Sequence, residues 1–249
     1  MLETKNIIIG GITGGIGSAL ARQLVQSGHK VQGFARESER IEKLSSELDI
    51  EIATLDATDP EALVDYFKSA KDELGDIDGY AHAIGSIFLK SAHLTSPEDW
   101  QKVIHTNLDS AFYALRACAP IMQKQGSGSF LFFSTAAAQI GIANHEAIAA
   151  AKGGIDAMVR SAAATYSSRG IRINAIAPSL TDTPLSQPIV GNERALELSK
   201  SMHPLGLIGQ AEDIASLAEW LLSDHARFAT GQTYTVDGGI STIVPKPKA

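Results

Sequence analysis

The segment Lys5–Ser27, KNIIIGGITGGIGSALARQLVQS, decides the fold. It opens with an apolar β-branched run at residues 7–9, which is typical of a buried parallel strand. Glycines follow at positions 10, 11, 14, 15 and 17, and then Ile16, Leu20, Leu24 and Val25 recur at helical spacing. Strand, glycine turn and helix in this order place unpaired N–H groups and the positive end of a helix dipole at one point, which favours phosphate binding. The competing interpretation is a tight turn that only packs a helix closely.

The totals describe an ordinary globular chain. It has 249 residues, 44% hydrophobic and 20% charged, which suits one α/β domain with a substantial core. The net charge of −7 argues against a nucleic-acid partner, and no apolar run is long enough to span a membrane. Cys118 is the only cysteine, which excludes a disulfide and a cysteine-based zinc site. We expect a cytoplasmic protein with no signal peptide and no metal, since the first strand follows within a few residues of Glu3.

Strand-like and helix-like segments alternate along nearly the whole chain. Further strands are expected at 29–35, 51–55, 77–84, 130–133, 171–177 and 232–236, and further helices at 37–48, 59–74, 97–122, 146–168 and 211–223. This alternation predicts a three-layer, doubly wound parallel sheet of the Rossmann type, as a single domain over residues 1–249. The proline-containing segment 178–209 is expected to be irregular. Its length favours a substrate lid over a plain surface loop.

The end of the second expected strand bears on the choice of cofactor. In this fold an acidic residue about 20 positions beyond the glycines binds the ribose of NAD, whereas arginine accommodates the 2′-phosphate of NADP. Here Ala35 occupies the acidic position, Arg36 follows it, and Arg40 lies one helical turn later. These residues favour NADP(H) over NAD(H), because guanidinium pairs well with phosphate. Glu37 is close enough to weaken the preference, and Arg36 as a solvated helix-start residue is the alternative.

Several motifs resemble those of the short-chain dehydrogenase/reductase family, over almost the entire chain. Residues 10–17 match its pattern Thr-Gly-x-x-x-Gly-x-Gly, with glycine in place of the threonine. Residues 170–178 (GIRINAIAP) and 230–239 (TGQTYTVDGG) match closely. Two segments depart from the family: residues 82–85 (His-Ala-Ile-Gly) keep only the glycine of Asn-Asn-Ala-Gly, and Ser179 takes the place of the glycine after Pro178. The resemblance implies a cofactor site made by Gly11, Thr13, Gly15, Ile16, Gly17, Arg36, Asp56, Ala57, Gly85, Lys152, Pro178 and Thr183.

The resemblance also implies a catalytic tetrad, which this chain keeps only in part. Asn107 and Lys152 match the family's asparagine and lysine, and Thr135 falls at the serine position. Ile148 stands four residues before Lys152, where the family has the tyrosine that acts as general acid or base. Isoleucine has no proton to donate. The resemblance therefore implies cofactor binding more directly than it implies the usual chemistry.

Histidines are the candidates for a replacement acid. His145 lies three residues before Ile148 on the same side of the expected helix as Lys152, and histidine titrates in the right range. The alternative is that His145 and Glu146 only cap the start of the helix. His82 is a second candidate, with a structural role favoured for it.

Two functions remain open. One is an NADP(H)-dependent oxidoreductase that acts on a carbonyl or conjugated enoyl substrate by a tyrosine-independent mechanism, with Thr135 orienting the substrate and His145 or water donating the proton. The other is a catalytically silent NADP(H)-binding sensor or scaffold. The resemblance further implies a homotetramer with helices around 97–124 and 146–168 at one interface, and the alanine-rich segment after Glu146 is compatible with close packing.

Overall fold

Seven parallel strands form the central sheet of the computed structural model, which describes residues 4–36 and 39–244. The strand order is β3-β2-β1-β4-β5-β6-β9, and every neighbouring pair is parallel. The strands are β1 (Asn6–Gly10), β2 (Lys30–Ala35), β3 (Ile52–Thr54), β4 (Gly79–His82), β5 (Gly128–Phe133), β6 (Ile171–Pro178) and β9 (Thr233–Val236). The order reverses between β2 and β4 on either side of β1, so the binding crevice of a doubly wound sheet is expected at the end of β1.

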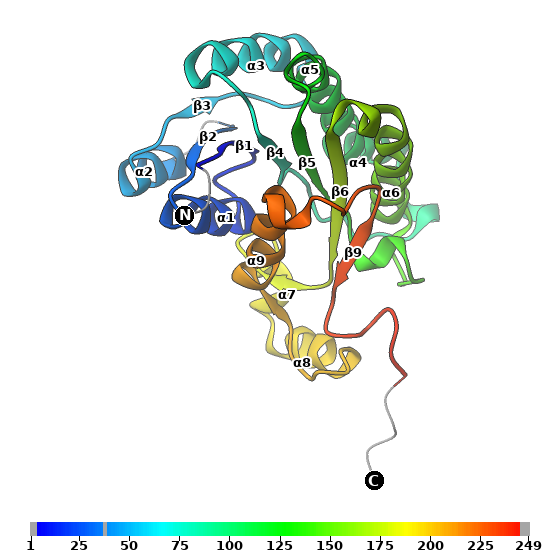
Figure 1. Cartoon of the computed structure of the whole chain (residues 1–249). Coiled ribbons are helices and arrows are strands. Elements are labelled where there is room, and N and C mark those ends of the chain that lie inside the picture. Colours follow the sequence, from blue (N-terminus) through cyan, green and yellow to red (C-terminus); the bar gives the residue numbers. More distant parts are fainter. Residues whose placement is uncertain (1–3, 37–38, 245–249) are drawn as a thin grey trace.

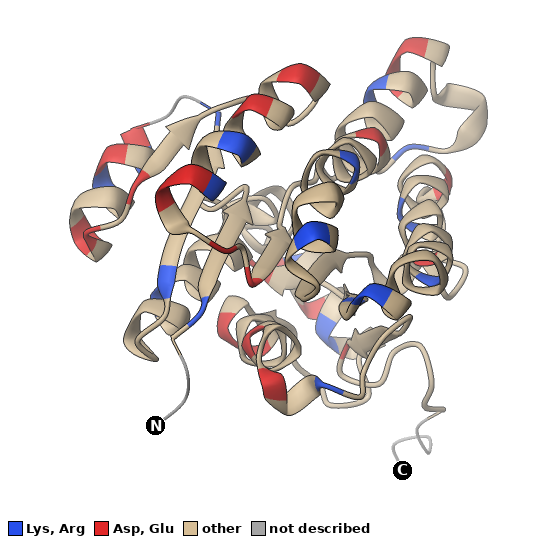
Figure 2. Cartoon of the chain, turned by 45° about the horizontal axis from the view of Figure 1, so that its top comes forward, with Lys and Arg blue, Asp and Glu red and all other residues tan. Residues whose placement is uncertain are grey.

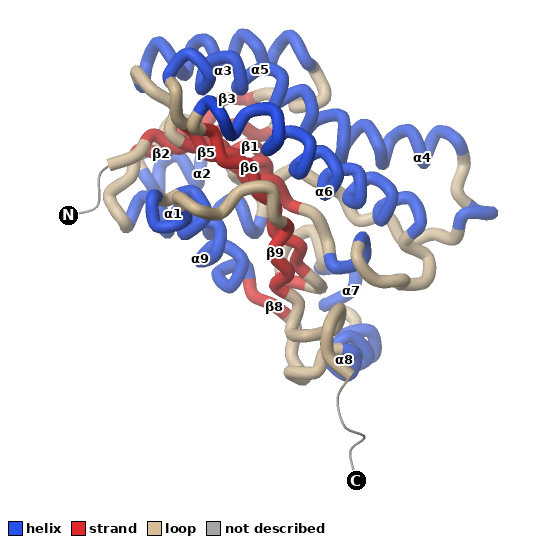
Figure 3. Tube along the Cα trace, turned by 45° about the vertical axis from the view of Figure 1, so that its right-hand side comes forward, coloured by secondary structure: helices blue, strands red, loops and turns tan. Residues whose placement is uncertain are grey.

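Helices cover both faces of the sheet, as the edge-on view in Figure 3 shows. One layer holds α1 (Gly15–Gln26), α2 (Glu39–Leu48) and α9 (Ala211–Leu222); the other holds α3 (Pro60–Leu74), α4 (Pro97–Ile104), α5 (Ser110–Gln125) and α6 (Glu146–Tyr166). Each layer has its own apolar core against the sheet. The predicted three-layer architecture is therefore confirmed. The expected start of the second helix at Glu37 lies outside the described residues.

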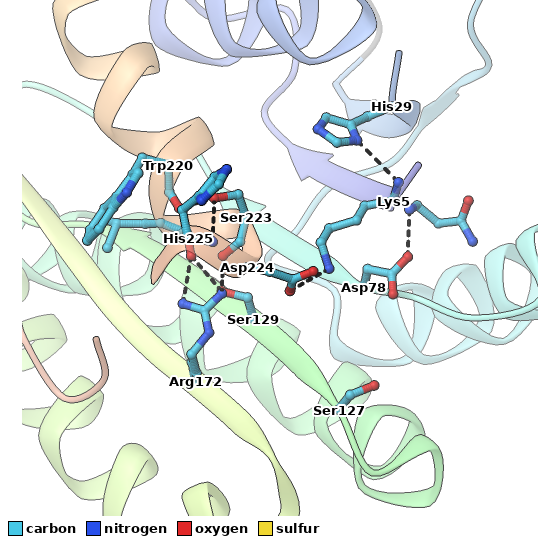
Figure 4. A network of polar contacts seen from close by, with 12 residues as sticks. Lys5, His29, Asp78, Ser127, Ser129, Arg172, Trp220, Ser223, Asp224 and His225 are labelled. Atoms are coloured by element: carbon cyan, nitrogen blue, oxygen red, sulfur yellow. Dashed lines mark hydrogen bonds and ion pairs between the residues drawn. The ribbon is translucent and has the colours of Figure 1, made fainter. Parts of the chain in front are cut away.

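Side chains near the amino ends of β5 and β6 bind the carboxyl end of α9, at the edge of the sheet opposite the glycine turn. The guanidinium of Arg172 on β6 donates to the carbonyls of Leu221 (2.8 Å) and Ser223 (3.0 Å), which end α9 (Figure 4). Ser129 on β5 donates to the same Leu221 carbonyl at 3.1 Å. These donors satisfy carbonyls that have no partner within the helix, so they fix α9 against β5 and β6.

The segment expected as one helix over 97–122 is interrupted. A π-helical turn, His105–Asp109, separates α4 from α5. Turns of this kind widen a helix locally and are frequent at functional sites. Here the turn contains Asn107, whose side chain is fully buried.

The expectation of an irregular segment at 178–209 is wrong. The segment contains β7 (Thr181–Asp182), α7 (Gln187–Val190) and α8 (Glu193–Met202), and β7 pairs with β8 (Gly209–Gln210). Asn192 starts α8 by accepting a hydrogen bond from the Ala195 N–H. Figure 1 shows α7 and α8 beyond the ends of β6 and β9, where they border the carboxyl edge of the sheet.

Charged residues are interspersed along the outer helices, Lys and Arg with Asp and Glu, as Figure 2 shows. Within residues 4–36 and 39–244, none of the helices combines the length and the apolar character needed to cross a membrane. In the same described ranges, no three His, Cys, Asp or Glu side chains are grouped as a metal ion would require.

Candidate functional site

The glycine turn between β1 and α1 is packed so closely that side chains are excluded at several positions. Gly11 has a φ of +76°, and a Cβ there would lie 2.7 Å from the carbonyl oxygen of Ala83. At Gly17 a Cβ would collide with the carbonyl oxygen of Gly11, and at Gly15 it would lie 2.5 Å from Cγ2 of Thr183. The turn therefore needs glycine both for its backbone conformation and for its close approach to neighbouring chain.

The start of α1 fits a phosphate group. The first backbone bond of the helix runs from Ser18 N to Gly14 O at 2.8 Å, so the N–H groups of residues 15–17 have no acceptor within the helix. Gly14 at the N-cap supplies no side-chain cap, and no acidic residue lies in the first turn. Of the other residues expected at the cofactor, Thr13 precedes these donors in the turn, and Ile16 supplies one of them. Unpaired donors, an uncompensated dipole and space for close approach are what a pyrophosphate requires.

The adenosine end of the predicted site lies at β2 and β3. Arg36 follows β2 and is exposed, and within the described part of the chain it has no ion pair. Asp56 is exposed after β3, and its Oδ1 accepts hydrogen bonds from Thr58 N (2.9 Å) and Thr58 Oγ1 (2.8 Å). Hydrogen bonds from Thr58, together with the charge of Arg36, lower the pKa of the Asp56 carboxyl. Ala57 is buried beneath it, and Glu37 lies outside the described residues.

Asn107 joins the π-turn to the segment that follows β4. Its Oδ1 accepts from Ser86 N at 3.0 Å, and its Nδ2 donates to Ser86 Oγ at 2.8 Å and to Val103 O at 2.9 Å. A Cβ on Gly85 would lie 3.1 Å from Asn107 Oδ1 and 3.3 Å from Lys152 Nζ. Asn107, Gly85 and Lys152 are therefore brought together, as expected from the sequence.

Lys152 is buried on α6, with its ammonium held by main-chain oxygens. Nζ donates to the carbonyl of Phe133 at 2.9 Å and to that of Ile84 at 3.5 Å. Burial lowers the pKa of Lys152 to about 8, while the charge of Asp156 opposes that shift. A desolvated ammonium at the floor of a cavity is suited to hold a ribose hydroxyl or to stabilise developing negative charge.

Thr135 follows β5 and reaches across to the end of β6. Its Oγ1 donates to the carbonyl of Pro178 at 3.4 Å and accepts from Ala137 N at 3.4 Å. Ser134, one residue earlier, donates to the carbonyl of Lys152 at 3.1 Å, so its hydroxyl is used inside the fold. Of these two neighbouring hydroxyls, the one with only long hydrogen bonds, and hence the one more easily turned to a substrate, is that of Thr135.

A cavity of about 540 Å³ adjoins these residues. Ile148 and His145 border it together with Thr135 and Lys152, and its remaining wall is largely apolar. His145 is the N-cap residue of α6, but its side chain does not cap the helix; Nδ1 donates to the carbonyl of Ala143 at 2.8 Å. His145 therefore caps the helix by its position and not by its side chain, and Glu146 lies in the first turn, where the helix dipole favours a carboxylate.

His82 belongs to a buried chain of hydrogen bonds away from the cavity. Ser110 Oγ donates to Thr106 O at 2.7 Å and lies 3.0 Å from His82 Nε2, while Nδ1 of His82 lies 2.7 Å from the Tyr80 hydroxyl. Burial, with the charge of Lys152, lowers the pKa of His82 to about 3. The histidine stays neutral and connects β4 to the π-turn, in keeping with a structural role.

A pair of polar cavity residues, Ser179 and His203, was not among the predicted site residues. His203, at the end of α8, is 5% exposed, and its Nε2 lies 2.8 Å from Oγ of Ser179. Both side chains border the cavity. Ser179 carried a signal in the sequence, because it replaces the glycine of the family pattern. His203 carried none, because 24 residues separate it from Ser179.

Known proteins of similar sequence and structure are dehydrogenases and reductases. The family model described as "Enoyl-(Acyl carrier protein) reductase" matches residues 11–241. The chain is 32% identical to "Inactive 2-(S)-hydroxypropyl-CoM dehydrogenase 2" of Xanthobacter autotrophicus, over 90% of this chain and 100% of that protein. It is 30% identical to the 3-oxoacyl-[acyl-carrier-protein] reductase FabG of Salmonella typhimurium, over 97% and 99% of the two chains. The solved structure of ElxO with NADP bound superposes with a TM-score of 0.91 at 25% identity, over 97% and 100% of the chains.

Proposed function

The chain belongs to the short-chain dehydrogenase/reductase family of oxidoreductases, and from this premise we propose that it uses NADP(H) to interconvert a carbonyl or conjugated enoyl compound and its reduced form without a tyrosine acid. The observation that carries the proposal is the shared cavity. It brings Thr135 and Lys152 to the carboxyl edge of the sheet, next to a glycine turn suited to pyrophosphate, while Ile148 occupies the tyrosine position.

A bound nicotinamide cofactor supplies or accepts hydride. The N–H groups of residues 15–17 would hold its pyrophosphate, and Lys152 would hold the nicotinamide ribose. Preference for the 2′-phosphate rests on exposed Arg36, on the absence of a carboxylate at Ala35, and on the likeness to ElxO with NADP bound.

The cavity wall supports an apolar substrate with one reacting oxygen. Side chains such as Ile142, Leu180 and Ile189 border the space, and none of the described residues that line it is Asp or Glu. The hydroxyl of Thr135 orients the oxygen by exchanging its 3.4 Å bond to Pro178 O for one to the substrate. FabG is named for 3-oxoacyl reduction, which agrees with a carbonyl substrate.

The proton comes from a group other than tyrosine. His145 is the donor that the sequence indicates, with water as the alternative. With Nδ1 bonded to the carbonyl of Ala143, its Nε2 is the atom available to exchange a proton at the cavity.

A silent cofactor-binding protein is the second candidate. Ile148 favours it, as does the 32% identity to a Xanthobacter protein whose name calls it inactive. In this function the cavity binds NADP(H) and a ligand, and no hydride moves.

Self-association into a homotetramer is part of the proposal. Helices at 97–124 and 146–168 are the proposed interface, and Trp100 and Phe112 support it with side chains 43% and 51% exposed. Large apolar groups exposed on adjacent helices are typical of a contact surface.

Titration with NADPH and NADH, followed by mixing with ketones, quinones and enoyl thioesters, tests the two functions. Cofactor binding with oxidation of NADPH supports the oxidoreductase. Binding without turnover, together with turnover by Ile148→Tyr, supports the silent protein. Failure to bind either nucleotide contradicts both.

A further inference from the structure

The hydrogen bonds of His203 fix how its ring is protonated. Nδ1 lies 2.6 Å from the main-chain oxygen of Ser199, and a carbonyl oxygen only accepts. Nδ1 therefore carries a proton. In the neutral ring Nε2 is an acceptor, so the hydroxyl of Ser179, 2.8 Å away, donates to it. This arrangement, a hydroxyl joined to a histidine that a third group orients, is the one that activates a hydroxyl for proton transfer.

Ser179 lies beside the place where a substrate oxygen is expected. It follows Pro178, whose carbonyl accepts the hydrogen bond of Thr135 Oγ1 at 3.4 Å. Thr135 and Ser179 therefore stand at the facing ends of the adjacent strands β5 and β6, and both border the cavity. A substrate oxygen that bonds to Thr135 is brought next to the Ser179 hydroxyl.

A carboxylate lies close to the ring of His203. The segment after β9 packs on the ring, since a Cβ on Gly238 would lie 3.3 Å from His203 Cδ2. Burial raises the pKa of the neighbouring Asp237 carboxyl, but hydrogen bonds from Ser241 and Gly239, with the charge of His203, lower it overall. An ionised Asp237 stabilises a positive charge that the ring acquires when it takes a proton from Ser179.

We propose that Ser179 and His203 form the proton relay of this enzyme, with Ser179 as the catalytic residue and His203 acting through it. The inference rests on the proposed function and replaces His145 as donor. In reduction, the carbonyl carbon receives hydride, the π electrons move to the oxygen, and that oxygen takes the proton of Ser179. For this step the ring has first taken a proton from solvent at Nε2 and become an imidazolium. The Ser179 oxygen takes that Nε2 proton as its own proton leaves, and the ring returns to the neutral form. Oxidation reverses each transfer.

If Ser179 and His203 form the relay, a tyrosine restored at position 148 should make the pair redundant. Ser179→Ala and His203→Gln are therefore compared in the natural chain and in the Ile148→Tyr variant, with Ser179→Gly as a second removal of the hydroxyl. Ser216 and His225 are exposed and remote, so Ser216→Ala and His225→Gln serve as matched controls. Fluorescence titration of NADPH and thermal melting establish that each variant binds cofactor and folds.

In the natural chain we expect each relay substitution to lower kcat by about 100-fold or more, with little change in the Kd for NADPH. In the Ile148→Tyr variant the same substitutions should cost less than about tenfold, because tyrosine then supplies the proton. Full turnover by Ser179→Ala and Ser179→Gly would overturn the relay and leave the oxidoreductase intact. Equal losses in both backgrounds would also overturn it, since they would indicate a structural effect. Absence of turnover in the natural chain would overturn relay and proposed function together.

Discussion

Ile148 precedes Lys152 by one turn of α6, and both side chains border the same cavity. The ammonium of Lys152 is held at the carbonyl of Phe133, and none of the described residues that line the cavity is a tyrosine. The chain thus keeps the positive charge that makes a neighbouring hydroxyl more acidic, and it lacks the hydroxyl at that position. The following predictions derive from this combination: a cofactor site that is kept and a tyrosine acid that is missing.

Ile148→Tyr should raise kcat for carbonyl reduction by about tenfold or more, because a positioned general acid contributes on the order of 10²–10⁴-fold and the relay supplies part of that already. The side chain of a helical residue leans towards the preceding turn, which places the phenol over the cavity. Steady-state kinetics with NADPH measure the effect. Ile148→Phe, which adds the ring without the hydroxyl, is the control, and an equal gain from Phe would contradict an acid role.

Lys152→Met should stabilise the fold near neutral pH. Burial lowers the pKa of Lys152 to about 8, so the unfolded chain binds the proton more tightly, and the ammonium costs on the order of 3 kcal/mol at pH 7. That cost disappears as pH rises from about 8 to about 10.5, where the folded and unfolded chains both become neutral. Urea unfolding at pH 7 and pH 10 should show a gain that shrinks with pH. Exposed Lys68→Met is the control; a gain independent of pH would contradict the prediction.

Arg36→Ala should weaken NADPH binding by about 10- to 100-fold, because a charge-assisted hydrogen bond contributes about 1.5–3 kcal/mol. NADH lacks the 2′-phosphate, so its Kd should change by less than about twofold. Fluorescence titrations of both nucleotides measure the difference. Arg227→Ala, exposed and remote, should leave both Kd values unchanged. Equal weakening of both nucleotides by Arg36→Ala would remove Arg36 from phosphate recognition.

Gly11→Ala should weaken NADPH binding at least tenfold and lower the free energy of unfolding by about 1–3 kcal/mol. The new Cβ meets the Ala83 carbonyl at 2.7 Å, and a φ of +76° is strained for alanine. Gly153→Ala is the matched control, since it lies inside α6 and a Cβ there meets no atom. Alanine at 153 should add about 0.5–1 kcal/mol of stability. Unaltered nucleotide affinity in Gly11→Ala would contradict the assignment of the turn.

The architecture was readable from the sequence because each strand and helix repeats its apolar residues at its own period. The spacing of apolar residues does not indicate where a helix widens into a π-turn. The stretch from Trp100 to Leu108 keeps a helical pattern, so the π-turn at His105–Asp109 went unpredicted. In the segment after β6, the prolines led to the wrong prediction of an irregular chain. Pro188 suggested an irregular chain, yet it lies in the first turn of α7, where its missing N–H costs nothing.

The candidate site also has residues that the sequence could predict and residues that it could not. Gly11, Lys152 and Asn107 belong to local patterns, and they meet at the carboxyl edge because parallel strands all end there. The pairing of Ser179 with His203 depends on how the end of α8 returns to the end of β6, which no local pattern encodes. The direction of the His145 ring is likewise not encoded locally: the residue is the N-cap of α6, but its ring bonds to the carbonyl of Ala143 and not to the helix.

Transfer of deuterium from NADPH labelled at nicotinamide C4 tests the central claim most directly. The natural chain, with Ile148 in place, is incubated with the labelled cofactor and a pool of ketones, quinones and enoyl thioesters, and the products are analysed by mass spectrometry. We predict a product that carries one deuterium at the former carbonyl or β-carbon. Saturable NADPH binding with no labelled product from the natural chain, while Ile148→Tyr does give one, would contradict tyrosine-independent catalysis.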